Sequence, residues 1–132
     1  MRMASALKGV SVLIVEDDPD ALDVLCIGLG AVGATVQAAA SAEAALVMLQ
    51  HWRPDVVLSD IQLPGVDGFA FLALLRANPQ LCTIPAAALT GLRAPLGGHD
   101  PAAFETYLTK PTRLPEIVIA LAALANRQRP GR

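Results

Sequence analysis

A strong charge of either sign is missing from this 132-residue chain. Lysine and arginine total 10 and aspartate and glutamate total 12, which leaves a net charge of −2. Because proteins that bind nucleic acid directly carry a clear basic excess, we do not expect direct nucleic-acid binding. Hydrophobic residues make up 54% and charged residues 17%, so the chain can bury a core and is not expected to be disordered.

Long apolar runs are also missing, and cysteine and histidine number only two each. No run approaches the roughly 20 apolar residues that span a bilayer, and the opening MRMASALKG lacks the apolar core of a secretion signal. We therefore expect no membrane insertion and a cytoplasmic location. Cys26 and Cys82 share no metal-like spacing, and His51 and His99 are isolated, which argues against a zinc site or a catalytic histidine.

The length of the chain suits one domain. Along it, short apolar runs alternate with stretches of helical periodicity. Strands are predicted over 10–15, 34–39, 55–59, 84–90 and 106–109, and helices over 19–29, 42–50, 67–78 and, opened by Pro115, 114–124. Asp18 and Ser41 are the predicted N-caps of the first two helices. Nearly continuous apolar strands that alternate with helices predict an α/β fold, with a doubly wound parallel sheet of five strands.

The stretch from Gly91 to Pro101 breaks this alternation. Two prolines and two glycines fall within seven residues, at Pro95, Gly97, Gly98 and Pro101. An interior proline costs a helix about 3 kcal/mol and each glycine about 1 kcal/mol. We therefore expect a shortened or irregular fourth helix.

Polar residues follow four of the predicted strands at their carboxyl ends. Glu16 and Asp17 follow the first, Asp60 follows the third, Thr90 ends the fourth, and Lys110 follows the fifth. In open α/β sheets these ends form the ligand crevice. Carboxylates held close together need a cation or a proton, and oxygen ligands at a partly open site favour Mg²⁺. A lysine and a threonine hydroxyl beside such a metal suit a phosphoryl group.

Four segments that carry these residues, VLIVEDDPDAL, PDVVLSDIQLPGVDGF, AALTG and YLTKP, together resemble the receiver domains of two-component response regulators. The resemblance extends from Leu7 to Leu124. Within the family, the sequence is most similar to receivers attached to hybrid sensor histidine kinases. The resemblance implies a flavodoxin-like (βα)5 domain over 7–127, between flexible termini at 1–6 and 128–132.

The resemblance also implies a metal site and a phosphoacceptor. Asp60 would accept a phosphoryl group from the phosphohistidine of a histidine kinase or a histidine phosphotransfer protein. Mg²⁺ would be held by Asp17 directly, by Glu16 through a water, by Asp60 and by the backbone carbonyl of Gln62. The domain would catalyse its own aspartyl phosphorylation and dephosphorylation, without being a conventional enzyme.

Three further residues receive roles from the same resemblance. Lys110 would pair with the phosphoryl oxygens, and Thr90 would hydrogen-bond the phosphoryl group and report its presence. Tyr107 would change its rotamer with Thr90, so that a partner reads a changed surface.

Other readings stay open beside this one. A degenerate receiver that acts as a protein-binding module without taking phosphate is the main alternative, which the intact set of acids and Lys110 argues against. An aspartyl phosphatase would want a second acid two residues after Asp60, where Gln62 stands. A flavin-binding protein would want a phosphate loop where Glu16 and Asp17 lie. The kinase, the stimulus, the output and the oligomeric state are left open.

Overall fold

Five parallel strands form one sheet in the computed structural model, which describes residues 3–91 and 103–128. Their order in the sheet is β2-β1-β3-β4-β5, so the chain winds in both directions from β1. Adjacent strands pair in parallel throughout this order. The strands are β1 (Ser11–Val15), β2 (Thr35–Ala39), β3 (Val56–Asp60), β4 (Ala86–Thr90) and β5 (Thr106–Thr109). The predicted doubly wound parallel sheet is confirmed.

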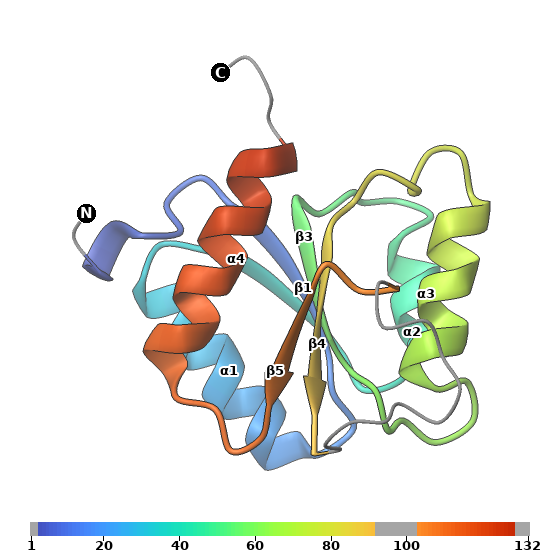
Figure 1. The fold of residues 1–132 in the computed structure, drawn as a ribbon, viewed down its shortest axis with the longest axis horizontal. Coiled ribbons are helices and arrows are strands. Elements are labelled where there is room, and N and C mark those ends of the chain that lie inside the picture. The colour runs from blue at the N-terminus through green and yellow to red at the C-terminus, as the bar shows by residue number, and fades with distance from the viewer. Residues whose placement is uncertain (1–2, 92–102, 129–132) are drawn as a thin grey trace.

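Helices cover both faces of this sheet. In Figure 1, α1 and α4 lie on one side of the strands and α2 and α3 on the other. Neither these helices nor any other in the described ranges has the length and apolar character to cross a membrane. The helices are α1 (Pro19–Ala31), α2 (Ala42–Met48), α3 (Gly68–Ala77) and α4 (Leu114–Gln128), and a short 3-10 helix (Met3–Ser5) precedes β1.

The core lies in two apolar clusters, one on each face of the sheet. In β1, Leu13 and Val15 belong to the cluster under α2 and α3, whereas Val12 and Ile14 belong to the cluster under α1 and α4. Because successive strand residues point to opposite faces, a strand buried on both faces must be apolar throughout. The apolar run of β1 has this cause.

Side-chain caps begin the three helices that follow strands β1, β2 and β3. The Asp18 carboxylate accepts a hydrogen bond from the Asp20 N–H, and Pro19 occupies the first turn of α1. Ser41 caps α2 and Asp67 caps α3 in the same way. Such caps satisfy backbone donors that have no partner within the helix. The caps predicted at Asp18 and Ser41 are confirmed.

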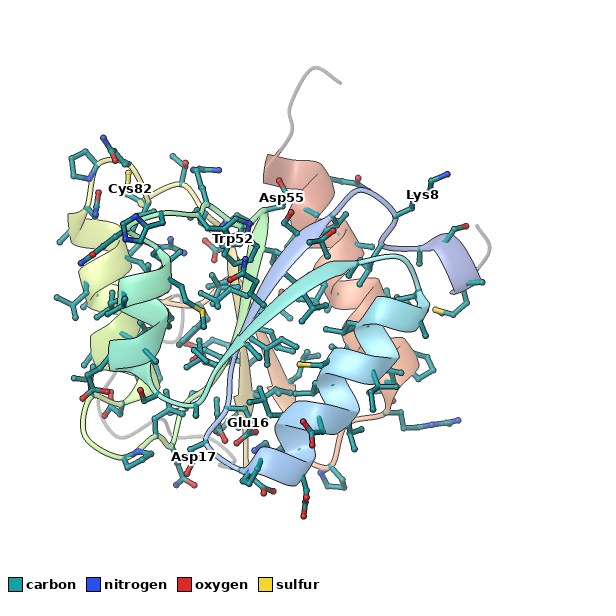
Figure 2. All side chains as sticks on the ribbon, turned by 180° about the vertical axis from the view of Figure 1, so that it is seen from behind. Lys8, Glu16, Asp17, Trp52, Asp55 and Cys82 are labelled. Carbon is teal, nitrogen blue, oxygen red and sulfur yellow. The ribbon has the colours of Figure 1, made fainter. Side chains whose placement is uncertain are left out.

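Some predicted element bounds are wrong by one or two residues. The third strand begins at Val56, because Asp55 lies outside it and accepts a hydrogen bond from the Ser11 N–H at 2.8 Å. Figure 2 places Asp55 at the end of the molecule opposite Glu16. The second helix ends at Met48, two residues earlier than predicted.

Two other expectations concern parts of the chain at or beyond the described ranges. The fourth helix, which the sequence predicts to be shortened or irregular, would fall on residues 92–102, and these lie outside the described ranges. The domain bounds 7–127 stay a prediction, although Leu7 is fully buried and α4 reaches Gln128.

Candidate functional site

Three carboxylates meet at the carboxyl ends of β1 and β3. Glu16 and Asp17 directly follow β1, and Asp60 is the last residue of β3. One carboxylate oxygen from each residue lies within 4.8 Å of the other two. Glu16 and Asp60 are buried, with 2% and 6% of their surfaces exposed, whereas Asp17 is exposed. Figure 2 shows Glu16 and Asp17 together at this end of the molecule. The fold therefore concentrates negative charge at the carboxyl ends of two neighbouring strands of the sheet.

Lys110 brings a positive charge to these acids from the far side of β4. Its Nζ atom lies 2.8 Å from Asp60 Oδ2 and 3.3 Å from Glu16 Oε1. Its backbone N–H donates to the Thr90 carbonyl at 2.7 Å, which ties the residue to the end of β4. The peptide bond to Pro111 is cis. Lys110 thus bridges the two buried acids.

Burial and charge act in opposite directions on the pKa values of this cluster. Burial raises the pKa of the Glu16 carboxyl above 4.5, and the charge of Asp60 adds to this, although the Asp18 N–H and Lys110 work against it. Burial lowers the pKa of Lys110, but its hydrogen bond to Asp60 and the charges of Asp60 and Glu16 outweigh that effect and raise it. The ammonium group therefore stays charged beside the acids at neutral pH.

The remaining residues predicted for the site lie at different distances from the acids. The Gln62 N–H donates to Asp60 Oδ1 at 3.1 Å, which orients the carboxylate. Thr90 is buried at the last position of β4, on the same edge of the sheet. The Tyr107 hydroxyl accepts a hydrogen bond from the Phe104 N–H at 3.4 Å instead of pointing to the acids.

Gly68, the first residue of α3, packs directly against the end of β3. A Cβ atom at this position would lie 2.5 Å from the Asp60 carbonyl oxygen and 2.7 Å from the Ile61 Cα. The Gly68 N–H also donates to the Ile61 carbonyl at 2.8 Å. Since both would-be neighbours are backbone atoms, only glycine fits here, and the helix is held close to the strand that carries Asp60.

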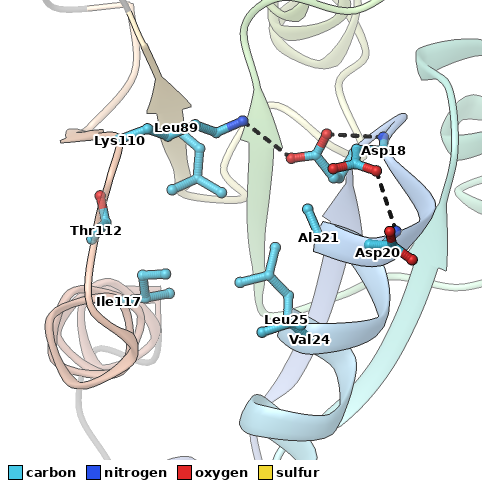
Figure 3. Close-up of a pocket in the computed structure, with 10 residues that line it drawn as sticks. Asp18, Asp20, Ala21, Val24, Leu25, Leu89, Lys110, Thr112 and Ile117 are labelled. Atoms are coloured by element: carbon cyan, nitrogen blue, oxygen red, sulfur yellow. Dashed lines mark hydrogen bonds and ion pairs between the residues drawn. The ribbon is translucent and has the colours of Figure 1, made fainter.

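A pocket of about 320 Å³ opens beside the acids, between α1 and α4. In Figure 3, Ala21, Val24 and Leu25 on α1 face Thr112 and Ile117 across this space. Glu16 and Lys110 belong to both the pocket and the acid cluster, so the two are continuous. The sequence did not predict this pocket, because it depends on how α1 and α4 pack, and the 65% exposure of Val24 is known only from the structure.

The donor atoms of the acid cluster fit a hard divalent cation. Glu16, Asp17 and Asp60 offer only carboxylate oxygens, and the single bridging ammonium of Lys110 does not balance three negative charges. Oxygen donors at a partly exposed site suit Mg²⁺, which keeps several of its waters. The site therefore combines three clustered carboxylates, which suit a divalent cation, with a lysine that contacts two of them.

Comparison with known proteins places this site in a family. The profile of the response regulator receiver domain matches residues 12–122. The transcriptional regulatory protein TcrA of Mycobacterium tuberculosis is 36% identical over 131 residues, which cover 96% of the chain and 50% of TcrA. The chain likewise spans about half the length of the transcriptional regulator RpaA of Synechocystis, with 34% identity over 119 residues.

Solved structures agree with the sequence relatives. The receiver domain of a histidine kinase from Syntrophus aciditrophicus superposes with a TM-score of 0.81 at 27% identity, and covers 93% of this chain and 95% of its own. The receiver domain of a sensor histidine kinase from Pseudomonas aeruginosa, with a magnesium ion in its active-site cleft, gives a TM-score of 0.78 at 27% identity and covers 89% of this chain and 98% of its own. The chain belongs to the response regulator receiver domains, the phosphoacceptor modules of two-component signalling.

Proposed function

We propose that Asp60 is the residue that takes the phosphoryl group, from a phosphohistidine of a histidine kinase or a histidine phosphotransfer protein. The observation that carries this assignment is the position of the Asp60 carboxylate, 2.8 Å from Lys110 Nζ and within 4.8 Å of the Glu16 and Asp17 carboxylates. A carboxylate that served only as a helix cap would need none of these neighbours. The alternative of a binding module without phosphorylation leaves this cluster unexplained.

The transfer is an in-line displacement at phosphorus. An oxygen of the Asp60 carboxylate forms the new P–O bond while the P–N bond to the donor histidine breaks, and the imidazole leaves with the electron pair and takes a proton. Catalysis of this step is mostly positioning and charge stabilisation. The Gln62 N–H orients the carboxylate. The Lys110 ammonium would pair with the phosphoryl oxygens and neutralise their negative charge. Water later hydrolyses the acyl phosphate.

Mg²⁺ would be held by Glu16, Asp17, Asp60 and the backbone carbonyl of Gln62. When bound, it supplies further neutralisation of the phosphoryl charge. The oxygen-only donor set supports this assignment, as does the magnesium ion in the cleft of the similar Pseudomonas receiver domain. Before the ion binds, Lys110 is the cation that offsets the repulsion between Glu16 and Asp60.

The phosphohistidine donor would contact α1 and the pocket beside the acids. Val24 and Ile27 on α1 are 65% and 73% exposed, and the pocket runs from Val24 to Lys110. A donor helix laid against α1 would place an apolar side chain in the pocket and its phosphohistidine at Asp60. A cytoplasmic location stays a prediction of this proposal, because the donor proteins act there.

The response to phosphorylation would be a population shift at Thr90 and Tyr107. Thr90 lies buried at the site edge, and Tyr107 lies one strand further out on β5. A phosphoryl group that favours one arrangement of these residues changes the surface that a partner reads. Direct contact of this chain with nucleic acid is not proposed, since its net charge is −2.

Phosphorylation from acetyl phosphate tests the assignment. Intact-mass analysis after incubation with Mg²⁺ should show one added phosphoryl group in the parent and none in Asp60→Asn. Asp67→Asn is the matched control, because Asp67 caps α3 on the same loop and asparagine keeps that cap. This control should be labelled like the parent. Labelling of Asp60→Asn at the parent level would show that another residue is the acceptor.

A further inference from the structure

Phe104 is buried beside Tyr107 in the segment that leads into β5. Only 2% of its surface is exposed. The centroid of its ring lies 5.7 Å from that of Tyr107, at an interplanar angle of 76°, and 5.7 Å from that of Phe69, at 66°. Both pairs have the edge-to-face geometry that aromatic rings prefer. Phe104 therefore joins Phe69, at the start of α3, to Tyr107 on the edge strand.

A hydrogen bond fixes the direction of the Tyr107 hydroxyl. It accepts from the Phe104 N–H at 3.4 Å. The backbone here is anchored to the first residue of β4, because the Glu105 N–H donates to the Ala86 carbonyl at 3.0 Å and the Ala86 N–H donates to Glu105 Oε1 at 2.8 Å. Since β4 runs from Ala86 toward the acid site, the Tyr107 hydroxyl is directed to the opposite end of the sheet.

Tyr107 and Thr90 nevertheless lie on the same face of the sheet. Tyr107 pairs with Ala88 across the two strands, and Ala88 precedes Thr90 by two positions. Residues two apart in a strand share a face, so the Tyr107 ring and the Thr90 side chain project to the same side. A tyrosine ring that turned toward Thr90 would lose the edge contact and the hydrogen bond with Phe104.

We propose that Phe104 is a positioning residue, which holds the Tyr107 hydroxyl away from Thr90 while Asp60 is unphosphorylated. The link to signalling rests on the proposed function, whereas the orientation itself is a property of the unphosphorylated protein. Edge-to-face pairs are weak enough to be broken and strong enough to bias a rotamer. Removing this pair should change the population of the Tyr107 orientations by about 2- to 10-fold.

Tyr107 is the one tyrosine of the sequence, so fluorotyrosine incorporation gives a single reporter for fluorine NMR. In the unphosphorylated protein, Phe104→Leu should split the Tyr107 resonance into two populations or broaden it by exchange between them, whereas loss of the Phe104 ring current alone would only move a single sharp resonance. Phe71→Leu is the matched control, because Phe71 is fully buried in the same apolar cluster. It should lower stability at least as much and leave the resonance in place.

Two results would overturn the proposal: a single sharp resonance in Phe104→Leu, or the same splitting or broadening in Phe71→Leu. A second measurement covers a variant that does not fold. In the parent protein, nuclear Overhauser effects should join the ring protons of Phe104 and Tyr107, and their absence would also overturn it. Neither experiment uses phosphorylation, so failure of Asp60 labelling and failure of this proposal are told apart.

Discussion

Glu16 is the most deeply buried acid of the described residues, with 2% of its surface exposed. Its Oε1 atom faces Lys110 at 3.3 Å and its Oε2 atom accepts from the Asp18 N–H at 3.1 Å. These contacts do not fully offset burial, since the pKa of Glu16 is raised. The folded state therefore retains a proton at Glu16 that the unfolded chain releases at lower pH.

This proton predicts a pH dependence of stability. Between 4.5 and the raised pKa of folded Glu16, the native state binds more protons than the unfolded state, so the contribution of Glu16 to the unfolding free energy falls as pH rises. Glu16→Gln removes this contribution of Glu16. The unfolding free energy of the variant, relative to that of the parent, should therefore increase with pH across this window. Urea unfolding at several pH values without metal measures the difference.

The control for this prediction is Glu116→Gln, which changes an exposed acid in the first turn of α4. Its difference from the parent should vary much less with pH. A Glu16→Gln difference that stays flat, or that shrinks as pH rises, would show that burial of Glu16 does not destabilise its charged form.

At the scale of elements, α1 and α4 approach closely where α1 has a glycine. The Leu114 side chain lies against Gly28, and a Cβ atom there would come within 2.5 Å of Leu114 Cδ2. Gly30, in the same helix, has no atom within 4 Å of its would-be Cβ among the described residues. The two glycines therefore offer the same change of helix propensity in two different packing environments.

We predict opposite outcomes for the two alanine substitutions. Gly30→Ala should raise the unfolding free energy by about 0.5–1 kcal/mol, because alanine has the higher helix propensity. Gly28→Ala should lose that gain and fall below Gly30→Ala by about 1–3 kcal/mol, since Leu114 must move. Thermal and urea unfolding measure both. Equal stabilisation by the two substitutions would show that Leu114 repacks without cost.

At the scale of the whole molecule, Mg²⁺ should stabilise the folded chain. The three carboxylates lie at the ends of two strands and meet only in the native sheet, so the ion would bind the folded state and not the unfolded one. At ten times the dissociation constant, the gain is about 1.4 kcal/mol. Melting curves with and without millimolar Mg²⁺ measure it.

Neighbouring aspartates provide the comparison for the metal effect. Asp17→Asn should abolish most of the stabilisation, whereas Asp18→Asn should keep it, because Asp18 caps α1 and asparagine is an equally good cap. A Mg²⁺ response of Asp17→Asn that equals that of the parent would remove Asp17 from the ligand set.

Local signals explain how much of this molecule could be predicted from its sequence. The apolar run of β1 and the caps at Asp18 and Ser41 depend on neighbours in sequence, and the structure has them as expected. The edge position of Asp60 followed from the rule for parallel sheets. The pocket between α1 and α4 and the contact between Phe104 and Tyr107 depend on how distant segments pack, and no local pattern encoded either.

Chemical mapping of the phosphoryl group tests the central claim most directly. Borohydride reduces an aspartyl phosphate to homoserine, which marks the acceptor permanently. After incubation of the parent protein with acetyl phosphate and Mg²⁺, reduction and peptide mass spectrometry should find homoserine at position 60, and this product should disappear when Mg²⁺ is replaced by a chelator. Homoserine at Asp17 or Asp67 instead, or at no position at all, would contradict the account.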